Sequence, residues 1–493
     1  MVRLYATVAL AATLLGLAPS RHPALPPSRR PAIPPSLLAP CLRPKAAGTN
    51  VQGAVKVCPG RYRIADPGER GVLIVAASGT SLDLTGVTLE SGDSIPARFV
   101  GVGVASKDVD GVTIVGGAVH GYRYGVRLDG GRDHRVRDID LSRSRTQTLQ
   151  STPERFNDGD WLDIFRPDVF ESYGSGLYLR RTIGATVTGV TATGAQNGIG
   201  LFETRASFIG SNDVSGNSGW GIHLWRSSGN VITRNRASRN VRCESPAYRR
   251  GCDSAALLLR QRSDSNTITD NDLSRSGDGL FLSGHRPDLQ PSVGNLVLRN
   301  DASHAWHNAF EATFSWNNTF IDNIADSSDY GFWMGYSSGS SVVGNTVIGS
   351  RTAGIAIEHG SDNLLSGNVV IGGPVGLRLF APNSDGAQSR GYRVDDNVFA
   401  KLTQAVVVER TAQVRLRGNL FDGVVDGIVI DSETNAVELA GNVFLRASGF
   451  FVRAPEVDAG GNFWGTGSAA EARLRVDGKV NVEPWRPARE AGY

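Results

Sequence analysis

The sequence is poor in lysine, methionine and cysteine. Only five of its 51 basic residues are lysine, methionine occurs only at positions 1 and 334, and there are four cysteines. These residues and the scattered histidines provide no cluster of soft ligands, which argues against a copper site. The basic residues are overwhelmingly arginine, either because the gene has a biased base composition or because guanidinium groups grip carboxylates bidentately.

Long hydrophobic runs and a large charge excess are also lacking. The formal net charge is +3, so nothing suggests an electrostatic surface for nucleic acid. The apolar run from Leu4 to Leu17 follows Arg3 and is too short to span a bilayer. Such a run is typical of a signal peptide, which is removed by cleavage. We therefore predict a signal peptide over residues 1–18, a proline-rich linker over 19–40, no transmembrane segment, and a secreted or periplasmic location.

The four cysteines allow three pairings, and none of their spacings resembles a zinc site. Proximity in sequence favours Cys41 with Cys58 and Cys243 with Cys252. Export makes both disulfides plausible, because such bonds persist in oxidising compartments.

No helical period is present, and a short phrase of the form Gly-x-x-x returns instead. It begins at Gly198, Gly221, Gly279, Gly331, Gly354 and Gly376, at steps of about 22 residues or more where residues are inserted. A second phrase bounded by asparagines follows roughly ten residues later, as from Asn230 to Asn235 and from Asn318 to Asn323. Both phrases alternate apolar and other residues, which is typical of short strands.

A unit of this size cannot bury its apolar face alone, so successive units must stack. We predict an all-β fold, a single-stranded parallel β-helix of about 14 to 16 coils with inserted loops. It occupies residues 41–487 as one domain and is followed by a tail over 488–493, and we expect a monomer. Asparagines that stack from coil to coil are expected to form a ladder.

The end of the repeat carries two further motifs, an Asn-x-Trp-Gly turn at Asn462 and a closing Pro-Trp at Pro484. Together with the coil repeat, they resemble the right-handed parallel β-helix proteins of the pectate-lyase-like superfamily. The resemblance is nearest to carbohydrate-binding and sugar-hydrolase β-helices and to NosD-like proteins. It implies a right-handed solenoid over about residues 50 to 487 and does not fix the chemistry, because one fold hosts many functions.

In each Gly-x-x-x phrase the second and fourth residues are apolar and should point inward, so the third residue and the one after the phrase point outward. Inward positions include Ile222, Leu224, Ile355, Ile357, Leu377 and Leu379. Outward aromatic and basic residues suited to stacking on sugars and binding them are Tyr178, Phe202, Trp225, Phe281, Trp333 and Arg378. Outward polar residues suited to catalysis are Arg180, His223, Arg260 and Glu311.

The largest insertion is a loop over residues 144–175, rich in carboxylates and aromatic residues. Smaller insertions lie at residues 242–253, 285–293 and 381–391, and all four should rim one side of the solenoid. The outward aromatic residues either line a binding groove or pack beneath these loops.

The sequence predicts a polysaccharide as substrate or ligand and leaves three functions open. A lyase or C5-epimerase on a uronate-containing polysaccharide is favoured, with His223 as the base and Arg180 or Arg260 as the cation on the carboxylate. A glycoside hydrolase would pair Glu311 with Glu203, Asp278 or Asp329. A non-catalytic carbohydrate-binding or surface protein is the third alternative.

No cofactor and no metal site are predicted, although calcium is possible. The densest acidic cluster is Asp158, Asp160 and Asp163 in the long loop, where a solvated acidic loop is the commoner meaning. His304 and His307 are three residues apart on a turn, and we expect a structural role for them.

Overall fold

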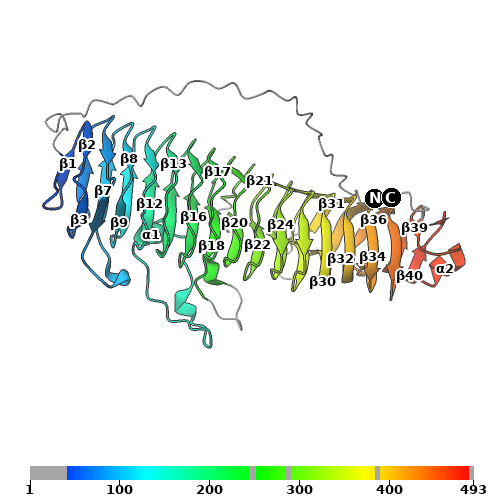
Figure 1. Cartoon of the computed structure of the whole chain (residues 1–493). Helices are drawn as coiled ribbons and strands as arrows, with labels where there is room; N and C mark the ends of the chain where they lie inside the picture. The colour runs from blue at the N-terminus through cyan, green and yellow to red at the C-terminus, as the bar shows by residue number, and fades with distance from the viewer. Residues whose placement is uncertain (1–40, 244–250, 285–289, 383–388, 488–493) are drawn as a thin grey trace, which may run out of the picture.

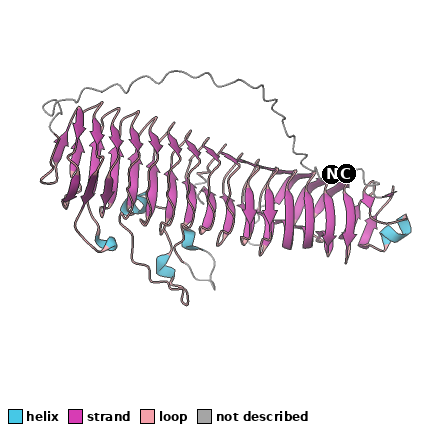
Figure 2. Cartoon of the chain, in the orientation of Figure 1, coloured by secondary structure: helices cyan, strands magenta, loops and turns pink. Residues whose placement is uncertain are grey.

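The short strands stack into one elongated solenoid in this computed structural model, which describes residues 41–243, 251–284, 290–382 and 389–487 (Figure 1). The predicted signal peptide, the linker and the C-terminal tail lie outside the described residues. Nearly every element is a strand, and the few helices sit in loops or at the C-terminal end (Figure 2).

One face of the solenoid carries the Gly-x-x-x strands in an unbroken parallel row. Seventeen strands pair in succession in the described residues, one more than the upper end of the expected range. They are β1 (Thr49–Val51), β4 (Leu73–Val75), β7 (Val102–Lys107), β10 (Tyr124–Asp129), β12 (Ser175–Arg180), β14 (Asn197–Phe202), β16 (Trp220–Trp225), β18 (Ala255–Arg260), β20 (Asp278–Ser283), β22 (Asn308–Thr313), β25 (Tyr330–Gly335), β28 (Ala353–Glu358), β30 (Val369–Phe380), β32 (Val398–Glu409), β35 (Asp426–Ile430), β38 (Val452–Asp458) and β40 (Val476–Asn481).

A second face is a parallel sheet of fifteen strands. They are β2 (Ala54–Lys56), β5 (Ser81–Asp83), β8 (Thr113–Val115), β11 (Arg135–Arg137), β13 (Thr186–Thr188), β15 (Phe208–Gly210), β17 (Val231–Thr233), β19 (Thr267–Thr269), β21 (Leu296–Leu298), β23 (Thr319–Ile321), β26 (Ser341–Val343), β29 (Leu364–Ser366), β31 (Ser389–Asp395), β33 (Thr411–Arg417) and β36 (Asn435–Ala440).

The remaining strands lie between these two faces, and the helices are short. The strands are β3 (Gly60–Arg63), β6 (Val87–Glu90), β9 (Ala118–His120), β24 (Ile324–Asp326), β27 (Thr346–Ile348), β34 (Leu420–Val424), β37 (Val443–Ala447), β39 (Phe463–Trp464) and β41 (Arg486–Pro487). The helices are η2 (Pro96–Arg98), η3 (Asp158–Asp160), α1 (Pro167–Ser172), η4 (Gly251–Asp253) and α2 (Ala469–Arg473).

The interior is one continuous apolar column, as the alternation predicted. All six side chains assigned to the inside are buried, at no more than 1% exposure: Ile222, Leu224, Ile355, Ile357, Leu377 and Leu379. Aromatic rings also stack inside from coil to coil, as with Phe421 and Phe444, whose centroids are 4.9 Å apart. The fold is therefore stabilised by burial that each coil shares with its neighbours.

A ladder of buried asparagines runs along one corner of the solenoid, as expected. Asn323 Nδ2 donates to Asn345 Oδ1 at 3.0 Å, and Asn345 Nδ2 donates to Asn368 Oδ1 at 3.0 Å. Each amide oxygen also accepts the backbone N–H of the preceding ladder residue, as Asn345 Oδ1 does from Asn323 N at 2.9 Å. The turn groups that the strands leave unpaired are thus satisfied by the next coil.

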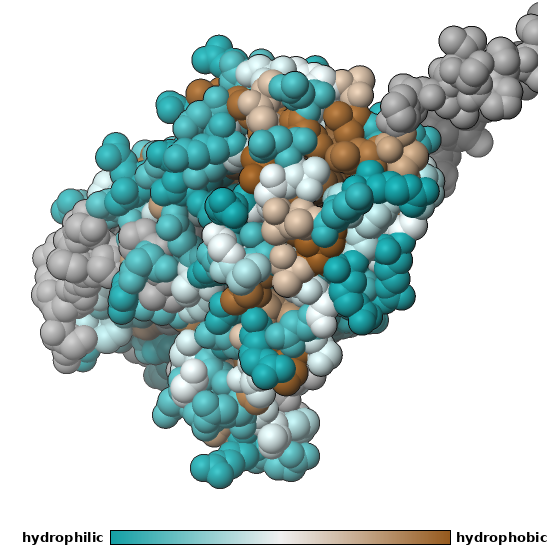
Figure 3. Space-filling model, turned by 90° about the vertical axis from the view of Figure 1, so that its left-hand side faces the viewer, coloured by the Kyte–Doolittle hydropathy of each residue, from teal (hydrophilic) through white to brown (hydrophobic). Residues whose placement is uncertain are grey.

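Both disulfides join the cysteines that proximity favours, Cys41 with Cys58 and Cys243 with Cys252. The first bond fixes the first coil, where Leu42, Val55 and Tyr62 are half-buried against the column. Viewed from this end, the surface is largely hydrophilic with a narrow hydrophobic band (Figure 3). The described parts of the early loops, which hold η2, η3, α1 and η4, project from one side of the solenoid (Figure 1).

Candidate functional site

The outward row of the Gly-x-x-x face has the register that the alternation predicted. His223 pairs with Leu258, Leu258 with Phe281, Phe281 with Glu311, and Glu311 with Trp333 on successive strands. Because each side chain of this row lies beside its partner on the next coil, the row forms one continuous strip along the solenoid axis.

The long loop covers the strip on its N-terminal side. Leu162, Ile164 and Tyr173 of the loop form a separate apolar cluster with Trp220, Ala255, Leu258 and Phe281 of the strands. The loop is also tied down by Arg242, which donates to Asp160 O and to Gln147 Oε1. Phe281, on the coil directly before that of Glu311, is therefore shielded from solvent.

Two of the predicted catalytic residues lie beneath this loop. His223 is 1% exposed, with its ring centroid 4.3 Å from that of Trp220, and burial and the charge of Arg260 lower its pKa well below the usual value. Arg260 is fully buried and donates to Ile164 O of the loop at 2.8 Å. A substrate would reach either residue only after the loop had moved, so the catalytic roles of His223 and Arg260 remain a prediction.

Arg180 is a partly exposed member of an ion-pair network. Its guanidinium contacts Asp129 at 3.1 Å and Glu171 at 2.8 Å, and it lies over the ring of Phe202. These carboxylates and the ring hold Arg180 in place on the solenoid.

Of the six residues predicted to bind a sugar, four are buried and two are accessible. Tyr178, Phe202, Trp225 and Phe281 are at most 7% exposed. They pack on one another and beneath the loop, as with Phe202 and Trp225, whose nearly parallel rings are 6.4 Å apart. Trp333 and Arg378, by contrast, line an open groove.

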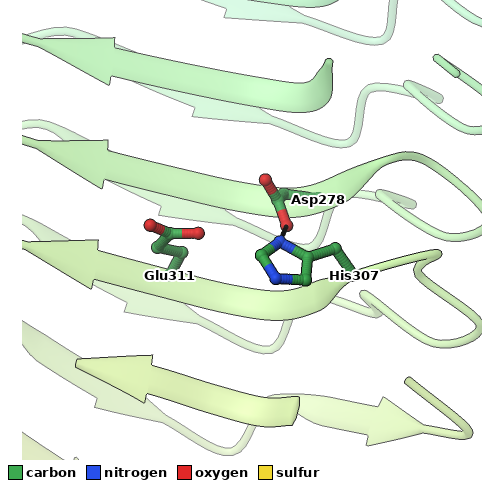
Figure 4. A group of neighbouring side chains, drawn as sticks. All are labelled: Asp278, His307 and Glu311. Carbon is green, nitrogen blue, oxygen red and sulfur yellow. Dashed lines mark ion pairs between the residues drawn. The ribbon is translucent and has the colours of Figure 1, made fainter. Parts of the chain in front are cut away.

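Asp278, His307 and Glu311 form a polar cluster where the covered strip ends (Figure 4). Asp278 begins β20, and Glu311 lies in β22 with Asn308, while His307 comes directly before that strand. Asp278 Oδ1 lies 3.3 Å from His307 Nδ1 and accepts the backbone N–H of Asn308 at 2.8 Å. One oxygen or nitrogen atom from each of the three residues lies within 4.8 Å of the others.

The Asn308 side chain connects the two more accessible members. Its amide group lies 3.0 Å from His307 Nδ1 and also bonds to Glu311 Oε2, while Thr313 donates to Glu311 Oε1 at 2.9 Å. The His307 side chain is 27% exposed, whereas that of Asp278 is 2% exposed. The His307 ring can therefore meet a ligand directly, whereas Glu311 is only 9% exposed and lies behind it with Asp278, which orients the His307 ring.

The cluster shifts the proton equilibria of its members. Burial, and then the charge of Asp278, raise the pKa of Glu311 to about 8. Burial opposes the charge on His307, yet its hydrogen bond to Asp278 and the carboxylate charge raise its pKa to about 9. Glu311 is therefore a proton donor at neutral pH, and between these two values it becomes a base beside a protonated imidazole.

A fourth titratable group comes from the disulfide-closed insertion. Asp253 belongs to η4, directly after Cys252, and burial followed by the charge of Asp278 raises its pKa to about 7. Its backbone oxygen accepts the indole N–H of Trp220 at 2.8 Å. A loop and two coils thus bring three carboxyl groups and one imidazole together.

The open groove begins on the next coil after Glu311. It has a volume of about 360 Å³ and is lined by aromatic rings and polar groups, among them Tyr330, Trp333, Arg378, Phe380 and Gln404. Arg378 lies over the Phe380 ring at 4.3 Å and donates to Glu409 at 2.7 Å. Flat rings beside polar groups are suited to binding sugars.

The cluster of Asp278, His307 and Glu311 is the one place among the described residues where three His, Cys, Asp or Glu side chains are close enough to hold a metal ion. Two carboxylates and an imidazole are a mixed set that suits transition ions, whereas calcium takes six to eight oxygen ligands. In the long loop, Asp160 accepts the backbone N–H groups of Gln150 and Ser151, so its oxygens already have partners.

Sequence reasoning selected Glu311, named Asp278 only as one of several possible partners, and missed His307 as a functional residue and Asp253 altogether. Asp278 could have been found, because the residue before each glycine of the repeat also faces outward, as Trp220, Ala255 and Tyr330 do. Asp253 and His307 lie on irregular turns, where the repeat does not predict direction. Of the other carboxylates considered, Asp329 pairs with Arg351 at 2.5 Å.

The sequence matches the family described as the right handed beta helix region over residues 100–293, 155–347 and 261–444, which together span more than half of the chain. The chain therefore belongs to this family, and its resemblance to the pectate-lyase-like superfamily is confirmed for the fold.

Several solved structures resemble the chain at low identity. The A-module of the mannuronan C-5 epimerase AlgE6 from Azotobacter vinelandii is 13% identical, with 80% of this chain and 91% of that chain covered and a TM-score of 0.46. The surface adhesin PfbA of Streptococcus pneumoniae is 11% identical over 80% and 85%, with a TM-score of 0.41. A family 28 exopolygalacturonase of Yersinia enterocolitica is 12% identical over 80% and 73%, with a TM-score of 0.41. At this level they are similar in fold alone, and no curated protein matches the chain.

No helix in the described part of the chain is both long and apolar enough to cross a membrane. The two disulfides are compatible with an extracellular or periplasmic location, because such bonds persist in oxidising compartments.

Proposed function

We propose that this protein is an enzyme that acts on a uronate-containing polysaccharide, by elimination or by C5 epimerisation. The observation that carries the proposal is that Glu311 and His307 lie side by side, on the coil next to Trp333, which lines the open groove. The groove binds the sugar chain, and Glu311 and His307 exchange protons with the sugar residue that lies beside them.

In the reaction, the Glu311 carboxylate removes the proton on C5, next to the uronate carboxylate. The electron pair moves toward that carboxylate, and a cation beside the carboxylate would stabilise the negative charge that builds up there. In elimination, the bond between C4 and the glycosidic oxygen breaks, a double bond forms between C4 and C5, and the His307 imidazolium protonates the leaving oxygen. In epimerisation, water or another donor must return a proton to C5 from the opposite face, because Glu311 and His307 lie side by side on one face.

Asp278 supports this division of roles. It keeps His307 protonated and fixes the ring, since its carboxylate contacts Nδ1. The burial of Asp278 makes it a poor nucleophile toward a sugar, which makes glycoside hydrolysis through Asp278 and Glu311 the less favoured alternative.

The test is product analysis on a panel of acidic polysaccharides, with ultraviolet absorbance for unsaturated ends, reducing-end assays, and NMR for epimerised residues. Glu311→Gln and His307→Ala should each lower the rate by about 10² to 10⁴ and preserve binding in an affinity gel. Trp333→Ala should weaken binding. The matched controls are Glu438→Gln on β36 and His304→Ala on the turn before His307, both exposed, which should keep full activity.

Three results would redirect the assignment. Retardation in the gel without any product from any substrate would leave a carbohydrate-binding protein. Loss of activity in His223→Ala but not in His307→Ala would move the chemistry beneath the loop, as the sequence predicted. Activity that a chelator abolishes and a divalent ion restores would assign the cluster to a metal.

A further inference from the structure

A second pocket lies near the N-terminal end of the solenoid, away from the groove. It has a volume of about 470 Å³ and lies between the loop that holds η2 and the turns after β3, β6 and β9. Its lining includes Arg63, Ser91, Phe99, His120 and Arg143. Such a volume is in the range of pockets that enclose small organic ligands.

Two of its arginines have no carboxylate partner among the described residues. Arg61 is paired with both oxygens of Glu90, at 2.7 and 2.9 Å, and Arg98 lies 3.4 Å from Asp93. These pairs neutralise the two carboxylates that line the pocket. Arg63 and Arg143 form no ion pair among the described residues, although the pKa of Glu90 is lowered first by Arg61 and also by the charge of Arg63.

The Arg143 guanidinium is held by the imidazole ring of His120 and by no carboxylate among the described residues. Arg143 Nη2 donates to His120 Nδ1 at 3.0 Å, so that nitrogen is an acceptor. His120 Nε2 then carries the ring proton and donates to Asp140 Oδ2 at 2.9 Å. His120 is 7% exposed, and Asp140 Oδ1 accepts the backbone N–H of Ser142 at 3.0 Å. Asp140 thus orients the ring without contacting Arg143.

Arg63 is positioned by a glycine. Gly92 has φ +90°, and a Cβ atom there would come within 2.9 Å of Arg63 Cγ. The glycine therefore lets the stem of Arg63, which lines the pocket, lie against the loop.

We propose that this pocket binds a sugar that carries an oxyanion, a carboxylate or a sulfate. Two guanidinium groups match such an anion, and serine hydroxyls together with the buried Phe99 ring match the hydroxyls and the apolar face of a sugar ring. The pocket is separate from the Glu311 cluster. Asp140 contacts His120 of the pocket, and Asp301 precedes β22, the strand that carries Glu311. Five coil-to-coil steps separate Asp140 from Asp301, which corresponds to roughly 24 Å at the usual spacing of parallel strands. Its occupancy does not depend on the proposed reaction.

The test is calorimetric titration of the full chain with glucuronic acid, glucose 6-sulfate, glucose and sodium sulfate. Saturable binding of the two acidic sugars is expected, with glucose and inorganic sulfate at least about tenfold weaker. Arg63→Gln and Arg143→Gln should each weaken the acidic sugars about tenfold. Arg135→Gln, an exposed arginine on β11, is the matched control and should change nothing.

Arg378→Gln separates this pocket from the groove, because the acidic sugars should still bind when the groove has lost its arginine. Binding that Arg378→Gln abolishes and Arg63→Gln does not would overturn the proposal. Equal affinity for glucose, or for sulfate alone, would overturn it as well. If Glu311→Gln loses turnover while the N-terminal pocket still binds the acidic sugars, the proposal for this pocket is supported.

Discussion

Glu311 is held in an environment that opposes its own charge. Its pKa lies at about 8 in the folded chain, compared with an ordinary value of 4.5, because the carboxyl is buried beside Asp278. The folded state therefore binds more protons than the unfolded state between these two pH values, and its stability falls as the pH rises through this range. A buried carboxyl group whose pKa is raised by burial and by a neighbouring carboxylate is typical of a functional position.

Replacement of Glu311 by glutamine should therefore stabilise the protein while it removes activity. The melting temperature of Glu311→Gln should exceed that of the parent at pH 8 to 9, and the difference should vanish below the ordinary pKa of 4.5. Thermal unfolding monitored by circular dichroism between pH 4 and 9 measures this. A difference of the same size at every pH would show that titration of Glu311 is not its cause.

The same pair sets the expected pH dependence of the reaction. Activity should rise as Glu311 ionises around pH 8 and fall as His307 loses its proton around pH 9, which gives a narrow alkaline optimum. Rates measured from pH 6 to 10 check this, with Glu438→Gln as the control. A profile that is flat across this range would exclude the pair as base and acid.

At the scale of elements, the long loop closes the strip on one side of the cluster only. Phe281, on the coil before Glu311, is covered by the loop, whereas Trp333, on the coil after it, borders the groove. In the proposed reaction, a sugar chain would therefore extend from Glu311 in one direction along the axis and not in the other.

Because the long loop blocks one side of the cluster, we predict that the enzyme acts at the ends of polysaccharide chains. Early in the reaction, one short product, or one modified terminal residue, should accumulate while the bulk polymer keeps its length. Size-exclusion chromatography of the polymer and mass spectrometry of the short products measure the two quantities. An early fall in polymer length with products of random size would mean that the loop does not block the site.

The elements differ in how well the sequence predicted them. The inward positions, the outward register and the asparagine ladder follow from the repeat, because each strand repeats the environment of the last. Trp225 and Phe281 were assigned correctly to the outer face, but the sequence did not decide whether they were open or covered. That depended on a loop whose conformation is set by contacts such as Ile164 with Arg260, which no period encodes.

The candidate site could be predicted only in part for the same reason. Glu311 lies within a regular strand and was found there. Asp253 and His307 approach it from turns of unequal length, so only the folded chain brings them together.

At the scale of the whole molecule, each strand pairs only with strands of the neighbouring coils. Removal of residues 398–419 would join Asn397 to Leu420, which occupies the place of Val398 on the next coil. The ladder would remain complete, since Asn397 would then meet Asn442 as Asn419 does now. We expect this one-coil deletion to fold cooperatively, and deletion of 398–408, half a coil, to fail. Circular dichroism and limited proteolysis distinguish the two, and equal folding of both would contradict a register-dependent ladder.

The ladder also sets the unit in which the gene can change length. Ladder partners are 20 to 23 residues apart on plain coils, such as Asn397 and Asn419, and 29 or 36 apart where a loop leaves, such as Asn235 and Asn271. Extra residues at a loop leave every amide paired, and so does a whole additional coil, whereas a partial coil strands buried amides. Insertions and deletions tolerated during evolution should therefore fall into two classes, free variation at the loops and steps of one coil elsewhere.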